Sequence, residues 1–311
     1  MSLDAEIAEL LPALNAGFPR VETMTAPQLR TVIRERRVRP PNPEPVGKVA
    51  DQTVPGPAGE INVRIYWPAT SSSPKALIVF AHGGGFVFCD LDSHDDLCRA
   101  MTNGVGAVVV SVDYRLAPES PWPAAAEDVY TVADWVARRP EALGVDSVHL
   151  IVAGDSAGGN LATVTALMAR DCRRPGIAGQ VLLYPVIAAD FGTVSYQRFG
   201  TGYYNTAAAM AWYWDQYVPR LADRNHPYAS PLQAELAGLP PAVVITAGCD
   251  PLRSEGDAYA KALANAAVPT IHRDYAGAIH GFMSMSGLGI CARARKQTWA
   301  DISGLLSRSL E

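Results

Sequence analysis

The sequence is poor in the features of membrane, nucleic-acid-binding and secreted proteins. No apolar run approaches the length needed to cross a bilayer, and residues 1–19 lack the basic start and unbroken apolar block of a secretory signal. Lysine and arginine together number 26 against 31 aspartates and glutamates, and no basic run is dense enough to follow a track of phosphates. We therefore expect no membrane span, no nucleic-acid partner and a cytoplasmic location.

Paired cysteines and metal-binding patterns are also missing. The five cysteines are an odd number, are scattered and include no Cys-x-x-Cys pair, which fits neither a disulfide framework nor a zinc site. The acidic stretch 89–96 lacks the spacing of an EF-hand loop, and Ser93 followed by Asp96 favours a helix start with Ser93 as its N-cap. We expect no metal and no other cofactor.

What the chain does contain is an alternation of apolar runs and helical patterns. Its 311 residues are 49% hydrophobic, which is enough for a large buried core. Because the runs are continuous rather than alternating, they favour strands covered on both faces. They lie at 76–82, 106–114, 149–155, 179–186 and 242–250. The sequence predicts an α/β fold with a mostly parallel central sheet flanked by helices.

Two segments depart from this alternation. Residues 1–40 have the pattern of two amphipathic helices, and the stretch of about 188–230 is too long for an ordinary crossover. We expect one domain over 1–311, with a helical cap built from these two segments. The aromatic stripe at 210–217 fits a helix core, but in a cap it would partly line a pocket, so Trp212 and Trp214 are candidate substrate contacts.

The run at 149–155 leads into a Gly-x-Ser-x-Gly motif centred on Ser156. The motif by itself is weak, but here a strand enters it and a helix leaves it, so the turn must be tight and its flanking residues small. Such a turn exposes the serine hydroxyl at the helix N-terminus. A glycine-rich connection without chemistry and a phosphate-binding loop are the alternatives.

A serine nucleophile needs a histidine to take its proton and an acid to orient that histidine. His280 precedes a glycine in a loop that can reach back over the strand ends, and Asp250 lies at the tip of the last buried run. The order Ser156, Asp250, His280 is the one expected for this chemistry. Alternatively, Asp250 caps the next helix and His280 is an ordinary loop histidine; Asp190 is the reserve acid.

Three consecutive glycines interrupt the strand at 76–82. A carbonyl attacked by Ser156 becomes an anion that backbone N–H groups can stabilise where no side chain blocks approach. We expect Gly83 and Gly84 to supply two donors and Ala157 a third. His82 is expected to brace the loop by hydrogen bonding.

With these motifs, the sequence resembles the hormone-sensitive-lipase-like esterases of the α/β-hydrolase superfamily. The resemblance runs from about residue 45 to the C-terminus. It rests on five motifs in family order: HGGGF (82–86), DYRLAPE (113–119), GDSAGGN (154–160), DPLRSEG (250–256) and HGF (280–282). It implies an α/β-hydrolase fold with a helical cap and a triad of Ser156, Asp250 and His280. Cys249 and Ser254 depart from the residues that are more common in the family.

The function implied is that of a serine carboxylesterase, which hydrolyses short- to medium-chain carboxylic esters through an acyl-enzyme. The oxyanion donors implied are Gly83, Gly84 and Ala157. An amidase, a lactonase or a deacetylase would use the same triad. A small-molecule receptor is the alternative from another class, since plant gibberellin receptors resemble this family but lack the working histidine, which His280 supplies here. The expected partner is a small ester substrate, and a homodimer stays open.

Overall fold

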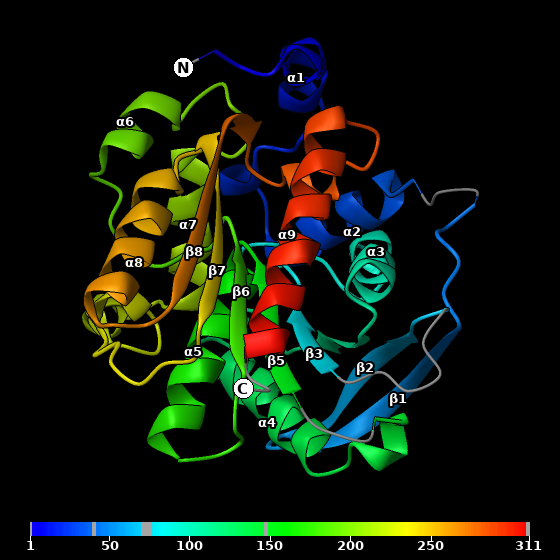
Figure 1. The fold of residues 1–311 in the computed structure, drawn as a ribbon. Coiled ribbons are helices and arrows are strands. Elements are labelled where there is room, and N and C mark those ends of the chain that lie inside the picture. The colour runs from blue at the N-terminus through cyan, green and yellow to red at the C-terminus, as the bar shows by residue number, and fades with distance from the viewer. Residues whose placement is uncertain (1, 39–41, 70–75, 146–148, 309–311) are drawn as a thin grey trace.

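The core of the protein is one eight-stranded sheet, seen in a computed structural model that describes residues 2–38, 42–69, 76–145 and 149–308 (Figure 1). The strand order is β1-β2-β4-β3-β5-β6-β7-β8. β2 runs antiparallel to β1 and β4, and all later neighbours are parallel. The strands are β1 (Lys48–Gly56), β2 (Gly59–Trp67), β3 (Ala76–Ala81), β4 (Val108–Asp113), β5 (His149–Asp155), β6 (Gly179–Leu183), β7 (Ala242–Cys249) and β8 (Thr270–Ile279). The predicted α/β fold is confirmed.

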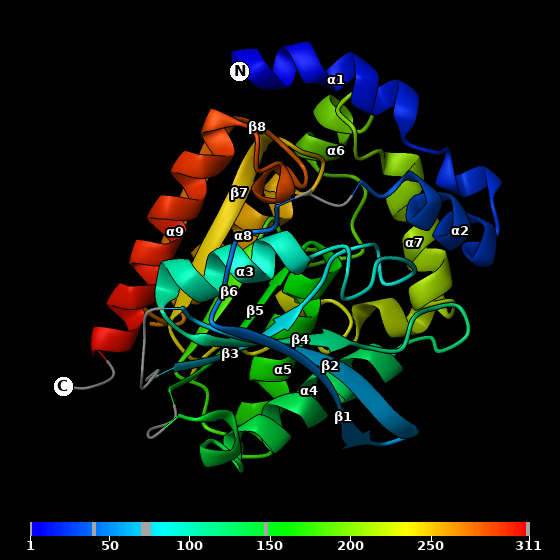
Figure 2. The same ribbon diagram turned by 90° about the vertical axis from the view of Figure 1, so that its right-hand side faces the viewer.

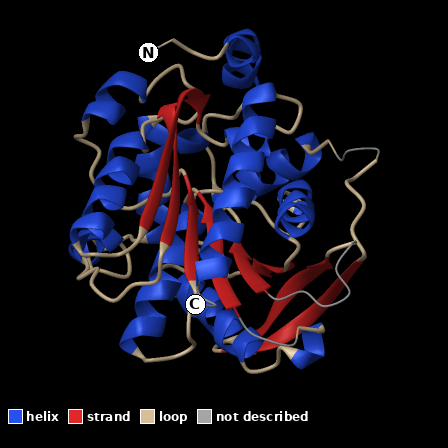
Figure 3. Ribbon diagram, viewed as in Figure 1, coloured by secondary structure: helices blue, strands red, loops and turns tan. Residues whose placement is uncertain are grey.

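Helices cover both faces of this sheet, which explains why its central strands are apolar throughout (Figures 2 and 3). α3 (Asp95–Val105) and α9 (Gly289–Arg308) pack on the face that holds Ile78 and Phe80. α4 (Ala124–Ala137), α5 (Ala157–Asp171) and α8 (Arg253–Asn265) pack on the opposite face, with Leu77 and Val79. Alternate residues of one strand therefore enter two separate cores.

The start of α3 differs from the sequence prediction. The N-cap residue is His94, without a side-chain capping bond, and not Ser93. The Ser93 hydroxyl instead donates a hydrogen bond to the Asp90 carbonyl, at 2.6 Å. Ser93 closes a turn one residue too early to cap the helix, which leaves the His94 side chain directed into the protein, where it is 7% exposed.

The two segments that depart from the alternation lie together beyond one end of the sheet (Figure 2). They hold α1 (Ala5–Gly17) and α2 (Ala26–Arg36), and α6 (Val194–Phe199) and α7 (Ala207–Tyr217). Asn15 of α1 donates to the Gly202 carbonyl at 2.9 Å, and Arg30 of α2 donates to the carbonyls of Val87 and Ala117 at 2.7 Å each. The expected helices are present within 2–38; residues 1, 39 and 40 lie outside the described part.

Five short 3-10 helices complete the described elements and connect the larger ones. They are η1 (Val21–Thr23), η2 (Glu141–Leu143), η3 (Leu221–Asn225), η4 (Pro231–Gln233) and η5 (Phe282–Ser284). η1 joins α1 to α2, and η5 joins β8 to α9, directly after the His280 loop. The C-terminal ends of β3, β5 and β7 and of β8 thus all open toward the same end of the sheet, where open α/β sheets collect their functional groups.

Candidate active site

Ser156 occupies a strained turn between β5 and α5. Its backbone has φ 54° and ψ −118°, a conformation that side-chain-bearing residues rarely adopt. A Cβ on Gly154 would overlap the carbonyl oxygen of Gly158, and a Cβ on Gly158 would overlap that of Ala81. Both positions must therefore be glycine for the helix to start this close to β3. The turn leaves the Ser156 hydroxyl on the wall of a cavity.

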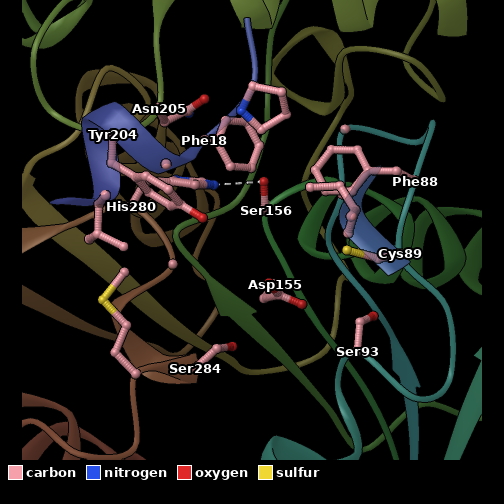
Figure 4. Close-up of a pocket in the computed structure, with 18 of the residues that line it drawn as sticks. Phe18, Phe88, Cys89, Ser93, Asp155, Ser156, Tyr204, Asn205, His280 and Ser284 are labelled. Carbon is pink, nitrogen blue, oxygen red and sulfur yellow. Dashed lines mark hydrogen bonds between the residues drawn. The ribbon is translucent and has the colours of Figure 1, made fainter. Parts of the chain in front are cut away.

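The three residues predicted from sequence order converge, and Figure 4 shows the contact between two of them, His280 and Ser156. The Nε2 atom of His280 lies 2.9 Å from the Ser156 hydroxyl oxygen, and its Nδ1 atom lies 2.7 Å from Asp250 Oδ2. Asp250 is fully buried directly after β7, and its Oδ1 atom accepts the Leu252 N–H at 3.0 Å. The predicted proximity is confirmed. Asp250 also organises the turn before α8, but it does not cap that helix, whose N-cap residue is Leu252 and has no side-chain capping bond.

These contacts assign the proton positions on His280. An ionised carboxylate only accepts hydrogen bonds, so Nδ1 bears the proton toward Asp250 and Nε2 presents a lone pair to Ser156. The ring of Tyr184 meets the His280 ring edge-on at 4.9 Å and limits its rotation. The reserve acid, Asp190, is exposed and accepts a hydrogen bond from the Gly192 N–H. Asp250 is therefore the acid that orients this histidine.

The glycine loop after β3 differs from the prediction in one position. The Gly83 N–H donates to Asp155 Oδ1 at 2.8 Å, so it cannot also donate to a substrate, and its assignment as an oxyanion donor is wrong. Within the described part of the chain, the N–H groups of Gly84 and Gly85 have no hydrogen-bond partner, and both residues line the cavity. The N–H of Ala157, the first residue of α5, is similarly free of an intrahelical partner. The N–H groups left without a partner are therefore those of Gly84 and Gly85, one residue later than predicted, together with that of Ala157.

His82 braces this loop, as the sequence predicted. It is fully buried, and its Nδ1–H donates to the Gly83 carbonyl at 2.7 Å. Its ring stacks on Tyr114 at 4.3 Å, and the Tyr114 hydroxyl donates to the His82 carbonyl at 2.8 Å. Burial, followed by the neighbouring charge of His94, lowers the pKa of His82 to about 4, so this side chain is neutral at physiological pH.

A cavity of about 540 Å³ opens above Ser156 and is mostly apolar. The two segments beyond the sheet end supply much of its wall. Lining residues from these segments are Ala13, Leu14, Gly17, Phe18, Pro19, Ile33, Arg36, Tyr204, Asn205, Met210 and Tyr213. Cys89 lines the cavity as well, but burial raises the pKa of its thiol to about 12, which keeps it from being a thiolate nucleophile.

Neither of the two tryptophans predicted as substrate contacts lines this cavity, so that prediction is wrong. Trp214 is fully buried and packs near Phe86, with ring centroids 6.4 Å apart, because it lies on the face of α7 that is turned into the core. Trp212 lies on a different side of the helix and is only partly buried. Met210 and Tyr213 line the cavity in their place.

The described residues contain no group of three or more histidine, cysteine, aspartate or glutamate side chains placed to hold a metal ion. Nor does any helix among them combine the length and apolar character needed to cross a bilayer.

The strand order, the strained serine turn and the hydrogen-bonded serine, histidine and aspartate define an α/β hydrolase. A model of the alpha/beta hydrolase fold family matches residues 78–284, and the chain belongs to this family, in its hormone-sensitive-lipase-like branch.

The chain is similar to named esterases over most of its length. It is 40% identical to "Esterase LipI" of Mycobacterium tuberculosis over 264 residues, which cover 84% of this chain and 82% of that protein. It is 34% identical to "Ethyl acetate hydrolase" of Pseudomonas putida over 301 residues, 93% and 94% of the two chains. Among solved structures, a hyperthermophilic esterase from Pyrobaculum calidifontis superposes with a TM-score of 0.91 at 41% identity, covering 98% of this chain and 99% of that one.

Proposed function

We propose that Ser156, His280 and Asp250 form the catalytic triad of a serine carboxylesterase. The single observation that supports this most is the continuous chain of hydrogen bonds from the Ser156 hydroxyl through His280 to the buried Asp250, at 2.9 and 2.7 Å. Membership of the family and similarity to named carboxylesterases along nearly the full chain make the protein a carboxylic ester hydrolase.

The triad works in two steps. His280 Nε2 takes the proton of Ser156 as the serine oxygen attacks the ester carbonyl, and then gives that proton to the leaving alcohol, which leaves an acyl-enzyme. His280 next takes a proton from water, the resulting hydroxide attacks the acyl carbon, and the proton returns to Ser156 as the acid leaves. In both steps the N–H groups of Gly84, Gly85 and Ala157 hold the oxyanion, because no side chain separates them from the cavity.

The cavity sets the class of ester. A volume of about 540 Å³ lies within the size range of small-molecule sites, and a wall that includes Leu14, Phe18 and Met210 favours an uncharged acyl chain. We propose short- to medium-chain esters as substrates, with α1, α2 and the segment 188–230 as a cap of one domain. An amidase, a lactonase or a deacetylase is not favoured, since the named relatives are esterases. A non-catalytic receptor is not favoured either, because His280 is present and contacts Ser156.

The remaining proposals concern location and assembly. We propose a cytoplasmic location, on the sequence features given above. The triad and the cavity come from a single chain, so this site does not require the homodimer that the sequence leaves open. Light scattering of the purified protein would show whether a dimer forms.

The test is a panel of 4-nitrophenyl esters of increasing acyl length. Ser156→Ala should lower turnover of every ester by at least about 10³-fold, since the nucleophile is lost. Ser303→Ala, on the outer part of α9, is the matched control and should retain full activity. Phe18→Ala should shift the preferred acyl length upward, because it enlarges the cap side of the cavity. Unchanged turnover in Ser156→Ala would overturn the serine mechanism. An unchanged preference for acyl length in Phe18→Ala would overturn the proposal that the N-terminal segment forms a cap over the substrate.

A further inference from the structure

A second histidine–aspartate pair lies directly beneath the loop of oxyanion donors. His94 Nε2 lies 3.1 Å from Asp155 Oδ1, and their side chains are only 8% and 7% exposed. Asp155 immediately precedes Ser156, and Figure 4 shows it on the cavity wall below the serine, beside Ser93. The triad mechanism uses neither member of this pair.

The hydrogen bonds around His94 fix its protonation state. The Ser93 hydroxyl lies 2.6 Å from the Asp90 carbonyl, which can only accept, so the hydroxyl proton points there. The same oxygen lies 2.9 Å from His94 Nδ1 and must accept from it. Nδ1 therefore bears a proton.

The other ring nitrogen of His94 faces Asp155. Burial raises the pKa of the Asp155 carboxyl, but the His94 charge and the bonds from His94 and Gly83 outweigh it, so the pKa is lowered overall. An ionised carboxylate can only accept, so Nε2 also bears a proton. His94 donates from both nitrogens, which makes it an imidazolium.

This pair is connected to the oxyanion donors through one peptide. Asp155 Oδ1 accepts the Gly83 N–H at 2.8 Å, and a Cβ on Gly83 would lie only 2.6 Å from Asp155 Oδ2. The carboxylate thus fixes the peptide that precedes Gly84 and Gly85. Left without a counter-charge, it would be a buried negative charge beside the place where the substrate oxygen becomes an anion.

We propose that His94 is a positioning residue of the oxyanion hole: its imidazolium neutralises Asp155, while the Asp155 carboxylate fixes the Gly83 amide and with it the donors of Gly84 and Gly85. The proposal rests on the proposed esterase function. The two pairs then have different roles: His280 transfers protons, and His94 neutralises and positions the Asp155 carboxylate.

The first experiment replaces the charge while keeping a donor. His94→Gln should lower kcat about tenfold and leave KM within about twofold, because an oxyanion hole acts on the transition state more than on the bound ester. The matched control is His272→Gln, since His272 Nε2 lies 3.2 Å from Asp257 Oδ1 in a more exposed pair near the start of β8, at the end of the strand away from His280. It should retain the wild-type kcat. Titration of active sites with diethyl 4-nitrophenyl phosphate ensures that kcat refers to folded enzyme only.

The second experiment separates charge balance from a loss of packing. In the double variant His94→Gln, Asp155→Asn the uncompensated carboxylate is gone, while the oxygen of the introduced side-chain amide can still accept from Gly83. Its kcat should exceed that of His94→Gln alone by about fivefold, which a purely structural role would not produce. A kcat of His94→Gln equal to wild type, or a double variant no faster than that single variant, would overturn the proposal. Neither outcome bears on the Ser156→Ala test of the esterase function itself.

Discussion

The two sides of Ser156 use the same pair of residue types for opposite purposes. On one side His280 contacts Asp250 at 2.7 Å and keeps one nitrogen, 2.9 Å from the serine hydroxyl, available as an acceptor. On the other side His94 contacts Asp155 at 3.1 Å and has both nitrogens engaged as donors. Both second nitrogens face a serine hydroxyl, but the Ser93 proton is directed to the Asp90 carbonyl, whereas the Ser156 hydroxyl can give its proton to His280.

The supports of the two sides differ as well. Asp250 and His280 follow adjacent strands, β7 and β8, so the sheet itself sets their separation. The loop after β3, which we propose supplies oxyanion donors from Gly84 and Gly85, is held by side chains, including Arg30 of α2, whose guanidinium donates to the Val87 carbonyl at 2.7 Å. Substitutions in the His280–Asp250 pair should therefore affect proton transfer directly. Substitutions in the His94–Asp155 pair should affect the rate through the position of the loop after β3.

The largest difference is expected from the same substitution in the two carboxylates. Asp250→Asn should lower kcat by about 10⁴-fold, because an amide can donate to His280 Nδ1 and so favours the wrong tautomer. Asp155→Asn keeps an acceptor for the Gly83 N–H and should lower kcat by only about tenfold. Steady-state kinetics with 4-nitrophenyl acetate measures both. Equal losses would show that the two pairs are not functionally distinct.

Motif context and chain order were sufficient to predict that Ser156, Asp250 and His280 lie together. A strand, a helix and two glycines around Ser156 leave the hydroxyl little freedom, and Asp250 is fixed at the end of a buried run. The error at Gly83 has a local cause: the motif shows that three amides are available, but not that Asp155, a neighbour of Ser156, accepts from the first of them. That acidic neighbour is the one sequence signal that pointed to the correct register.

Side-chain direction in the cap could not be predicted in the same way. The aromatic stripe of α7 contains residues on several sides of the helix, and only tertiary contacts decide that Tyr213 faces the cavity while Trp214 faces Phe86. His94 was missed for a related reason. In the sequence it is one residue of an acidic helix start, and only the Ser93 turn directs it toward Asp155.

A smaller effect is expected from blocking the oxyanion loop. Gly84 has φ +110°, and a Cβ there would overlap the carbonyl oxygen of Phe88, so Gly84→Ala should displace the loop. We expect a kcat loss of roughly 10²–10³-fold, comparable to the loss of one oxyanion donor. Gly144→Ala is the control, since Gly144 has φ +71° with open space around it. If both variants lose activity equally, backbone strain alone explains the effect and the loop donors are not needed.

The smallest expected effect concerns stability on the oxyanion side. Since the pKa of His82 is lowered from 6.5 to about 4 in the folded protein, the unfolded chain binds its proton first as the pH falls. The stability that neutral His82 provides is complete above about pH 6.5 and is lost progressively toward pH 4, by up to about 3 kcal/mol. Urea unfolding at pH 7, 6 and 5 should show this slope in the wild type.

Two variants connect that slope to the second pair. His82→Gln removes the titrating group and should flatten the dependence on pH between 6.5 and 4. The ring centroids of His94 and His82 lie 5.6 Å apart, and the charge of His94 lowers the pKa of His82. His94→Gln removes that charge, so the pKa of His82 should rise and the loss of stability with falling pH should be complete at a higher pH. An unaltered slope in His94→Gln would mean that residue 94 bears no charge in the folded protein. His94 would then be neutral, as the proposed base His280 must be, and the two histidine–aspartate pairs would not differ in charge.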